Sequence, residues 1–79
     1  MRQTLTHARQ LGHILRARRK AQRLTQRDLA AKLAITQHRL SQIEADPSAL
    51  PLRRLLDLSN ILGLDVIVQD RRSASKTDW

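Results

Sequence analysis

The stretch from residue 24 to residue 44, LTQRDLAAKLAITQHRLSQIE, constrains the fold most because it predicts two short helices joined by a tight break. Thr25 followed three residues later by Asp28 is a helix start signal, in which each side chain can bond the backbone N–H of the other residue. The apolar residues that follow recur at the spacing of one helix face. The break is predicted at residues 33–35, and Thr36 is the expected N-cap of the second helix.

The second of these helices has two contrasting faces. At about 100° per residue, Leu40 and Ile43 point to one side, and the other side carries uncharged hydrogen-bonding groups, one Arg and no acid. The outward-facing residues are Gln37, His38, Arg39, Ser41 and Gln42. A helix that lies in water usually mixes acids and bases, whereas a helix that reads base edges needs this kind of surface. The composition of the face therefore favours nucleic-acid recognition.

Positive charge is concentrated in the first half of the chain. The net charge is +8; residues 1–40 hold ten Lys or Arg against one acid, whereas residues 41–79 hold five against six. This uneven field favours nucleic acid or an acidic membrane as partner over a merely solvated basic surface. No apolar run approaches the roughly 20 residues of a membrane span, so we expect a cytoplasmic protein without a membrane partner.

Composition narrows the class of protein further. The 79 residues suffice for one small domain with an aliphatic core, since only 1% of them are aromatic. There is no cysteine, which excludes disulfides, thiolate zinc sites and cysteine nucleophiles. The three histidines are scattered, and no Gly-rich phosphate loop, HExxH or nucleophile elbow is present. We therefore expect no catalysis, no metal and no cofactor.

Further helices are predicted on both sides of the pair. Residues 1–6 have no periodic pattern and are expected to form a flexible arm, whereas residues 7–22 follow a helical pattern. Pro47 ends the second helix of the pair, and Pro51 begins a Leu-rich helix that Gly63 should terminate. The predicted fold class is all-α, a compact domain of four to five helices.

Residues 64–69 change to the alternating pattern of a β-strand. A lone strand in a helical domain has no mate for its backbone donors and acceptors, so we expect it to pair with the same strand of a second copy. The alternative is that the preceding helix runs on past Gly63. The residues assigned to the resulting dimer interface are Leu64, Val66, Ile67 and Val68.

The last residues, 71–79, form a polar tail that we expect to be disordered. The helical domain with its dimerisation strand is therefore assigned to residues 7–70. The tail ends in Trp79, the only aromatic residue of the chain. This ring is interpreted as part of a frayed terminus, as an anchor for a partner protein, or as a tag that a protease recognises.

Spaced positions within residues 11–63 resemble the Cro/C1-type helix-turn-helix family. They are Leu24-Thr25-Gln26, Asp28-Leu29-Ala30, Thr36-Gln37, Leu40-Ser41 and Ile43-Glu44, followed by a Leu-rich helix. Within this family the chain looks most like HipB-type antitoxins, because it is short, has a strand directly after its last helix and ends in a polar tail with Trp. The resemblance implies a homodimer that binds palindromic double-stranded operator DNA, represses its own operon and neutralises a HipA-like Ser/Thr kinase toxin.

The resemblance also assigns expected roles to single residues. Base contacts are expected from Gln37, His38, Arg39 and Gln42, and phosphate contacts from Arg23, Gln26, Arg27, Thr36 and Ser41. Arg19 and Glu44 match a pair that forms an internal ion bridge in the family. Arg23 and Ala34 stand where relatives usually have Gly, so each is strained by about 1 kcal/mol if the backbone needs a positive φ there. Arg18 stands where many relatives place an apolar residue.

Two other interpretations remain open at this point. A stand-alone Cro/C1-type regulator, such as a phage repressor or a restriction controller, shares the DNA chemistry but has no toxin partner. A basic module that binds RNA or an acidic protein is the third interpretation. The lack of aromatic residues among the cations weighs against RNA recognition by stacking.

Overall fold

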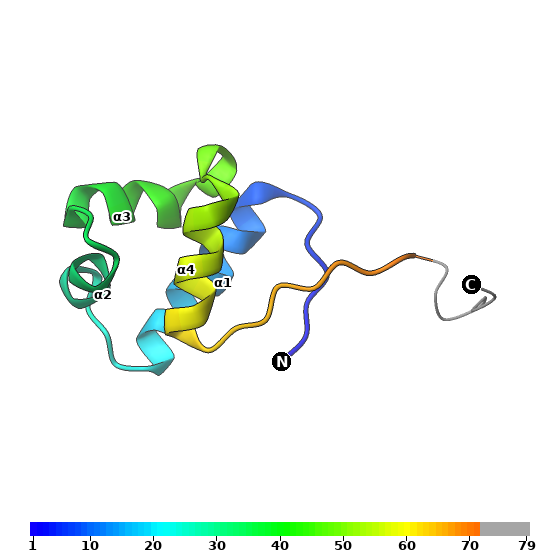
Figure 1. The fold of residues 1–79 in the computed structure, drawn as a ribbon, viewed down its shortest axis with the longest axis horizontal. Coiled ribbons are helices and arrows are strands. Elements are labelled where there is room, and N and C mark those ends of the chain that lie inside the picture. The colour runs from blue at the N-terminus through cyan, green and yellow to red at the C-terminus, as the bar shows by residue number, and fades with distance from the viewer. Residues whose placement is uncertain (72–79) are drawn as a thin grey trace.

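Four α-helices and one turn of 3-10 helix make up residues 1–71, the part of the chain that a computed structural model describes. They are α1 (Ala8–Ala21), α2 (Gln26–Leu33), α3 (Gln37–Ala45), the short η1 (Pro47–Ala49) and α4 (Leu52–Leu62). In Figure 1, α2 and α3 lie at one end of the molecule, and the N-terminus and the segment after α4 lie on the other side of the helices. The predicted all-α, four-helix fold is confirmed. The predicted tail with Trp79 lies outside the described residues.

The starts of α2 and α3 are set by local side-chain hydrogen bonds. The Thr25 hydroxyl accepts from the Asp28 N–H (3.0 Å), and the Thr25 N–H donates to the Asp28 carboxylate (3.1 Å). This donation by the Thr25 backbone N–H, together with the Thr25 side chain, holds the pKa of the Asp28 carboxyl below its ordinary value. The Thr36 hydroxyl accepts from the Arg39 N–H at 3.0 Å. Both predicted N-caps are therefore present.

Three helices end in the same left-handed bend. The φ angles are +59° at Arg23, +57° at Ala34 and +69° at Gly63. After each bend, a backbone N–H donates to a carbonyl of the preceding helix: Leu24 to Arg19 (3.1 Å), Ile35 to Ala30 (3.0 Å) and Leu64 to Ser59 (2.8 Å). These bonds satisfy carbonyls that the helix ends would otherwise leave open. Gly63 suits this conformation, whereas Arg23 and Ala34 adopt it with a Cβ atom.

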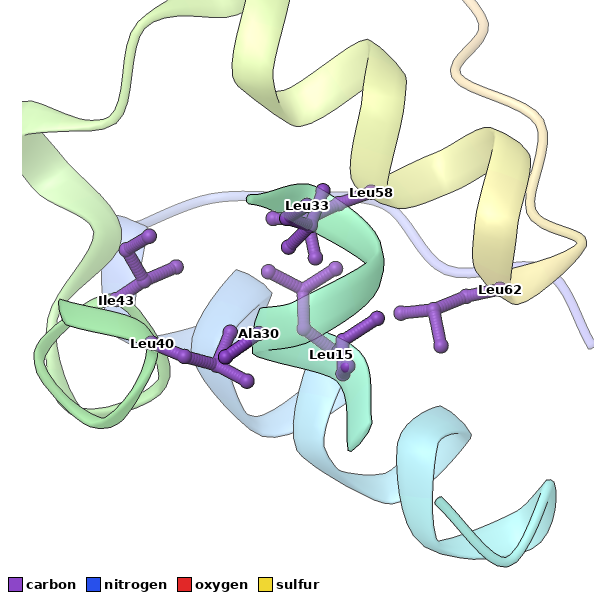
Figure 2. Close-up of a cluster of buried hydrophobic side chains, with 8 residues drawn as sticks. Leu15, Ala30, Leu33, Leu40, Ile43, Leu58 and Leu62 are labelled. Carbon is purple, nitrogen blue, oxygen red and sulfur yellow. The ribbon is translucent and has the colours of Figure 1, made fainter. Parts of the chain in front are cut away.

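All four helices contribute to one aliphatic core. The buried apolar side chains are Leu15 from α1, Leu29, Ala30 and Leu33 from α2, Leu40 and Ile43 from α3, and Leu58 and Leu62 from α4. Figure 2 shows how labelled members of this set converge on a common centre. None of the eight is more than 5% exposed. This core fixes the position of α3 relative to the other helices.

Gly12 lies in the middle of α1 and is buried, and its role in helix packing was not predicted. A Cβ atom at this position would lie 2.4 Å from the backbone oxygen of Glu44 and 3.3 Å from a ring carbon of Pro47. Only a glycine therefore lets α1 approach the end of α3 so closely. An isolated Gly inside a helical pattern is the signal that could have pointed to such a contact.

The segment after α4 corrects one prediction. Helix α4 ends at Leu62, so the alternative in which it runs past Gly63 is wrong. The predicted strand is also not formed within residues 1–71, because a strand requires a neighbouring strand and this single chain supplies none. Leu64 packs against the core, but the side chains that follow are open, reaching 98% exposure at Val68. Pairing across a dimer stays a prediction.

Residues 1–7 lie beside this C-terminal segment in Figure 1. The Gln10 side chain of α1 donates to the Thr4 carbonyl (2.7 Å) and accepts from the Thr6 N–H (2.9 Å). The Arg2 guanidinium donates to the Gln69 side chain. The two terminal segments are therefore joined to each other and to the start of α1.

Candidate nucleic-acid interface

Helix α3 presents its polar face outward. Leu40, Ile43 and Glu44 are buried, whereas the remaining side chains of its first two turns are exposed. The exposed residues are Gln37, His38, Arg39, Ser41 and Gln42. None of their side chains makes a hydrogen bond or ion pair within residues 1–71. All of these donors and acceptors are therefore available to a ligand.

A buried ion pair holds α3 against α1. The Arg19 guanidinium donates to both carboxylate oxygens of Glu44, at 2.7 and 3.2 Å, and also to the Leu24 carbonyl at 2.8 Å. Arg19 and Glu44 are each only 7% exposed. Removing one partner of such a pair typically costs about 3–5 kcal/mol, since the other charge stays buried. Arg19 thus has a structural role and is not free to contact DNA.

Gln26 joins the same network from the start of α2. Its side-chain amide donates to Glu44 Oε1 at 3.1 Å, which holds the half-buried side chain beside α3. The amide oxygen and second N–H make no other hydrogen bond within the described residues. The backbone N–H groups of the first turn of α2 also form the positive end of the helix dipole. Phosphate is the ligand that this arrangement favours.

The other expected phosphate contacts lie on three different elements. The Thr36 hydroxyl oxygen already accepts from Arg39, which leaves its O–H free to donate outward. Arg23 lies in the bend after α1, Arg27 in the first turn of α2, and Ser41 on α3; all three are exposed. All of them are open to a ligand, and phosphate contact by these residues stays a prediction.

Two side chains from the run at residues 16–23 bond the end of α4 and so have structural roles. Arg18 donates to the Leu62 carbonyl at 2.7 Å, and Gln22 donates to the same oxygen at 2.8 Å. A cation at this carbonyl suits the negative end of the α4 dipole, which explains a charged residue where relatives are usually apolar. Arg54 similarly donates to the Leu33 carbonyl at 3.0 Å and ties α4 to the end of α2.

Among residues 1–71, no metal site competes with the outer face of α3. Within residues 1–71, no three His, Asp or Glu side chains gather as a metal ion would require. One open hollow is lined by Gln22, Leu24, Lys32 and Ile61. Lys32 is the only charged side chain among these four, and none of them is a Ser, Thr or Cys nucleophile. In the same part of the chain, none of the helices has the length and apolar character that a membrane crossing needs. The outer face of α3 is therefore the best candidate site.

A short helix that follows another after a tight turn, with an outer face of hydrogen-bonding side chains, one Arg and no acid, is typical of a helix-turn-helix unit. The helix-turn-helix family model matches residues 15–68, and the chain belongs to this family, in its Cro/C1-type branch. This is a family of DNA-binding transcription regulators and not of enzymes.

Similar proteins agree with this assignment. The chain is 36% identical, over 58 residues and 73% of its length, to the HTH-type transcriptional regulator y4dL of Sinorhizobium fredii. It spans only 30% of the length of that relative. Among solved structures, an MDT protein matches with a TM-score of 0.77 and 26% identity, covering 89% of this chain and 99% of the other.

Two further solved structures are HipB complexes. A chain of a HipB-O1-O2 complex matches with a TM-score of 0.77 and 26% identity, covering 87% of this chain and all of the other. A chain of a HipA-HipB-O2-O3 complex matches with the same score and identity, covering 89% of this chain and 99% of the other. The resemblance to HipB-type proteins is therefore confirmed at the level of the fold, over nearly the whole matched chains.

Proposed function

We propose that the protein is an antitoxin that binds a palindromic operator as a homodimer, represses its own operon and neutralises a HipA-like Ser/Thr kinase. The observation that carries the DNA-binding part is the outer face of α3, which offers free hydrogen-bonding side chains and no acid. The toxin-binding part is supported by the near-full-length similarity to chains from HipB complexes, one of which contains HipA.

Base recognition is assigned to the first two turns of α3. In the major groove, the Gln37 amide can bond both N6 and N7 of one adenine, and His38 can donate to a guanine acceptor. Arg39 and Gln42 lie further round the helix and contact bases or flanking phosphates. Gln26 and Thr36, at the starts of the two helices, fix the register by bonding phosphates, and the exposed Arg23, Arg27 and Ser41 add contacts.

Dimerisation is assigned to residues 64–69, including Leu64, Val66, Ile67 and Val68. The apolar side chains from Val66 to Val68 are exposed in the single chain, at 45%, 68% and 98%. Pairing with the same segment of a second copy would satisfy the open backbone groups and cover these side chains. It would also supply a second α3 for the other half-site, about 34 Å away along the duplex.

A stand-alone transcription regulator is the second candidate, and the similarity to y4dL favours it. The two candidates differ in whether a kinase binds the protein. Capture of the tagged full-length chain from its native host distinguishes them: a kinase in near-equal amount supports the antitoxin, and DNA alone supports the regulator. Deleting residues 73–79, which contain the tail with Trp79 outside the described part, tests whether that tail contributes to toxin binding.

The change Gln37→Ala tests the role of α3 directly. We expect operator binding to weaken by about 1–3 kcal/mol, with non-specific DNA binding unchanged, because a base contact is lost and no phosphate contact is. Titrations of the operator and of a scrambled duplex, followed by fluorescence anisotropy, measure both. Asn60→Ala removes an exposed amide from α4 and serves as the matched control. Equal losses on the two duplexes would contradict base reading by Gln37.

A further inference from the structure

Four basic or titratable side chains form a stripe along the outside of α1. They are Arg9, His13, Arg16 and Lys20, and they fall within about 60° of one another around the helix axis. All four are exposed, and none makes a side-chain hydrogen bond or ion pair within residues 1–71. Helix α1 contains no acidic residue. We call this set the α1 stripe.

The stripe does not serve the stability of α1. Arg9 lies in the first turn, where the positive end of the helix dipole disfavours a cation. The Arg16–Lys20 pair is spaced four residues apart, and like charges at this spacing repel. The cations that do stabilise the fold, Arg18 and Arg19, point elsewhere, to the Leu62 carbonyl and to Glu44. The arrangement is therefore better explained by an external anion.

The position of the stripe relates it to the helix pair. Around the axis of α1, Gly12 falls between the buried Leu15 and the stripe. Gly12 faces the backbone oxygen of Glu44, so the stripe lies on the side of α1 that adjoins the last turn of α3. The Glu44 carboxylate in turn holds Gln26, the residue assigned above to a phosphate. Glu44 thus links the two regions, because its backbone oxygen meets Gly12 beside the stripe and its carboxylate accepts from Gln26.

We infer that the α1 stripe binds the phosphate backbone of the DNA that flanks each half-site, on the duplex that α3 of the same protomer reads. From Arg9 to Lys20 the helix rises about 16 Å. A duplex strand carries one phosphate per about 3.4 Å of axis, so a stripe of this length faces about five of them. Flexible Arg and Lys side chains add affinity without sequence preference. This inference rests on the proposed operator binding.

The test compares two duplexes and two double variants of the full-length protein. One duplex is the operator cut at the outer ends of its two half-sites, as the palindrome defines them, and the other carries ten more base pairs of mixed sequence on each side. The variant Arg16→Gln/Lys20→Gln removes two charges from the stripe. The control Lys32→Gln/Arg53→Gln removes two exposed charges, one from α2 and one from α4. Thermal melting by circular dichroism checks that both variants fold as the wild type does.

On the long duplex, we expect the stripe variant to bind at least about tenfold more weakly at about 0.1 M salt. The slope of log affinity against log salt should fall by about 2, because each lost phosphate contact contributes about 0.9. On the trimmed duplex the stripe variant should match the wild type. The control should match the wild type on both duplexes.

Three results would overturn the inference. The first is a wild type that binds the two duplexes equally, which leaves operator binding intact but shows no flank contact. The second is an equal loss for the stripe variant on both duplexes, or the same loss in the control. The third is a stripe variant that keeps its DNA affinity but loses a captured protein partner. If the wild type protects no operator at all, the proposed function fails, and the inference fails with it.

Discussion

The helix pair and the segment after α4 differ in how far a single chain satisfies their polar groups and covers their apolar side chains. In the helix pair, the starts of both helices are capped by their own threonines, and Glu44 accepts from both Arg19 and Gln26. In residues 64–70, apolar side chains are open to water and no strand is formed. The first region is complete within one chain. The second exposes apolar side chains, which we propose a second copy covers.

This difference between the two regions suggests that the helix pair determines folding and the segment after α4 determines assembly. The interactions that position α3 all lie within residues 8–62, so a single chain can build the reading helix without a partner. Under the proposed function, one α3 covers only half of a palindromic site, and affinity for the whole site should depend on the dimer. Changes in the two regions should therefore affect different measurements: stability for the helix pair, oligomeric state for the C-terminal segment.

The largest effect is expected from Val66→Asp. The side chain is 45% exposed in the single chain, so the charge should leave the fold of the monomer intact. At the proposed interface, however, two buried and unpaired carboxylates would face each other, which prevents association. Analytical ultracentrifugation should show monomers, and tight operator binding should be lost. Asn60→Asp adds the same charge to α4 as a control. A dimer that survives Val66→Asp would rule out this interface.

The next largest effect is expected from Glu44→Ala, which acts on the other region. It leaves the Arg19 guanidinium buried without its counterion and releases Gln26. We expect a loss of about 3–5 kcal/mol in the free energy of unfolding, measured by urea denaturation. Asp57→Ala removes an exposed carboxylate from α4 and should change stability little. Similar stabilities for both variants would show that the buried pair does not hold α3.

The sequence was informative where an interaction is local. Thr25 and Asp28 are three residues apart, Thr36 caps the helix that follows it, and Gly63 ends the helix that precedes it. Pairs distant in the chain were not predictable from spacing. The bonds from Arg18 to the Leu62 carbonyl and from Arg54 to the Leu33 carbonyl depend on how whole helices pack. The ion pair of Arg19 with Glu44 was expected only through the family resemblance.

The predicted strand at residues 64–69 is not formed within residues 1–71 for a different reason. Its alternating pattern describes the faces of the segment, but its backbone groups require a second strand, and the described part of the chain supplies none. A pattern can thus indicate a structure that exists only in the assembly. The candidate site was predictable only in part. The exposure of the polar face of α3 followed from helical periodicity, whereas the contact of Gln26 with Glu44 did not.

Gly12→Ala should have a smaller effect on the fold than loss of the ion pair. Helix propensity alone would make Ala more favourable than Gly by about 1 kcal/mol. The added Cβ, however, would meet a backbone oxygen at 2.4 Å, and α1 and α3 would have to move apart. We expect a net loss of about 1–3 kcal/mol in the free energy of unfolding. Ala17→Gly on the exposed side of α1 reverses the substitution as a control. A stabilised Gly12→Ala variant would contradict the close approach.

The smallest effect is expected from Ala34→Gly in the bend between α2 and α3. Ala34 has a φ of +57°, which is unfavourable for a residue with a Cβ atom, and it is exposed. Gly should raise the free energy of unfolding by up to about 1 kcal/mol, because relief of the strain exceeds the extra entropy of the unfolded chain. The same substitution at Ala31, an exposed position inside α2, should lower it by about 1 kcal/mol. Opposite signs in urea denaturation would show that the bend, and not composition, decides the effect. Equal losses at both positions would mean that the helix pair carries no strain at its turn, and that the left-handed conformation of Ala34 is compensated elsewhere.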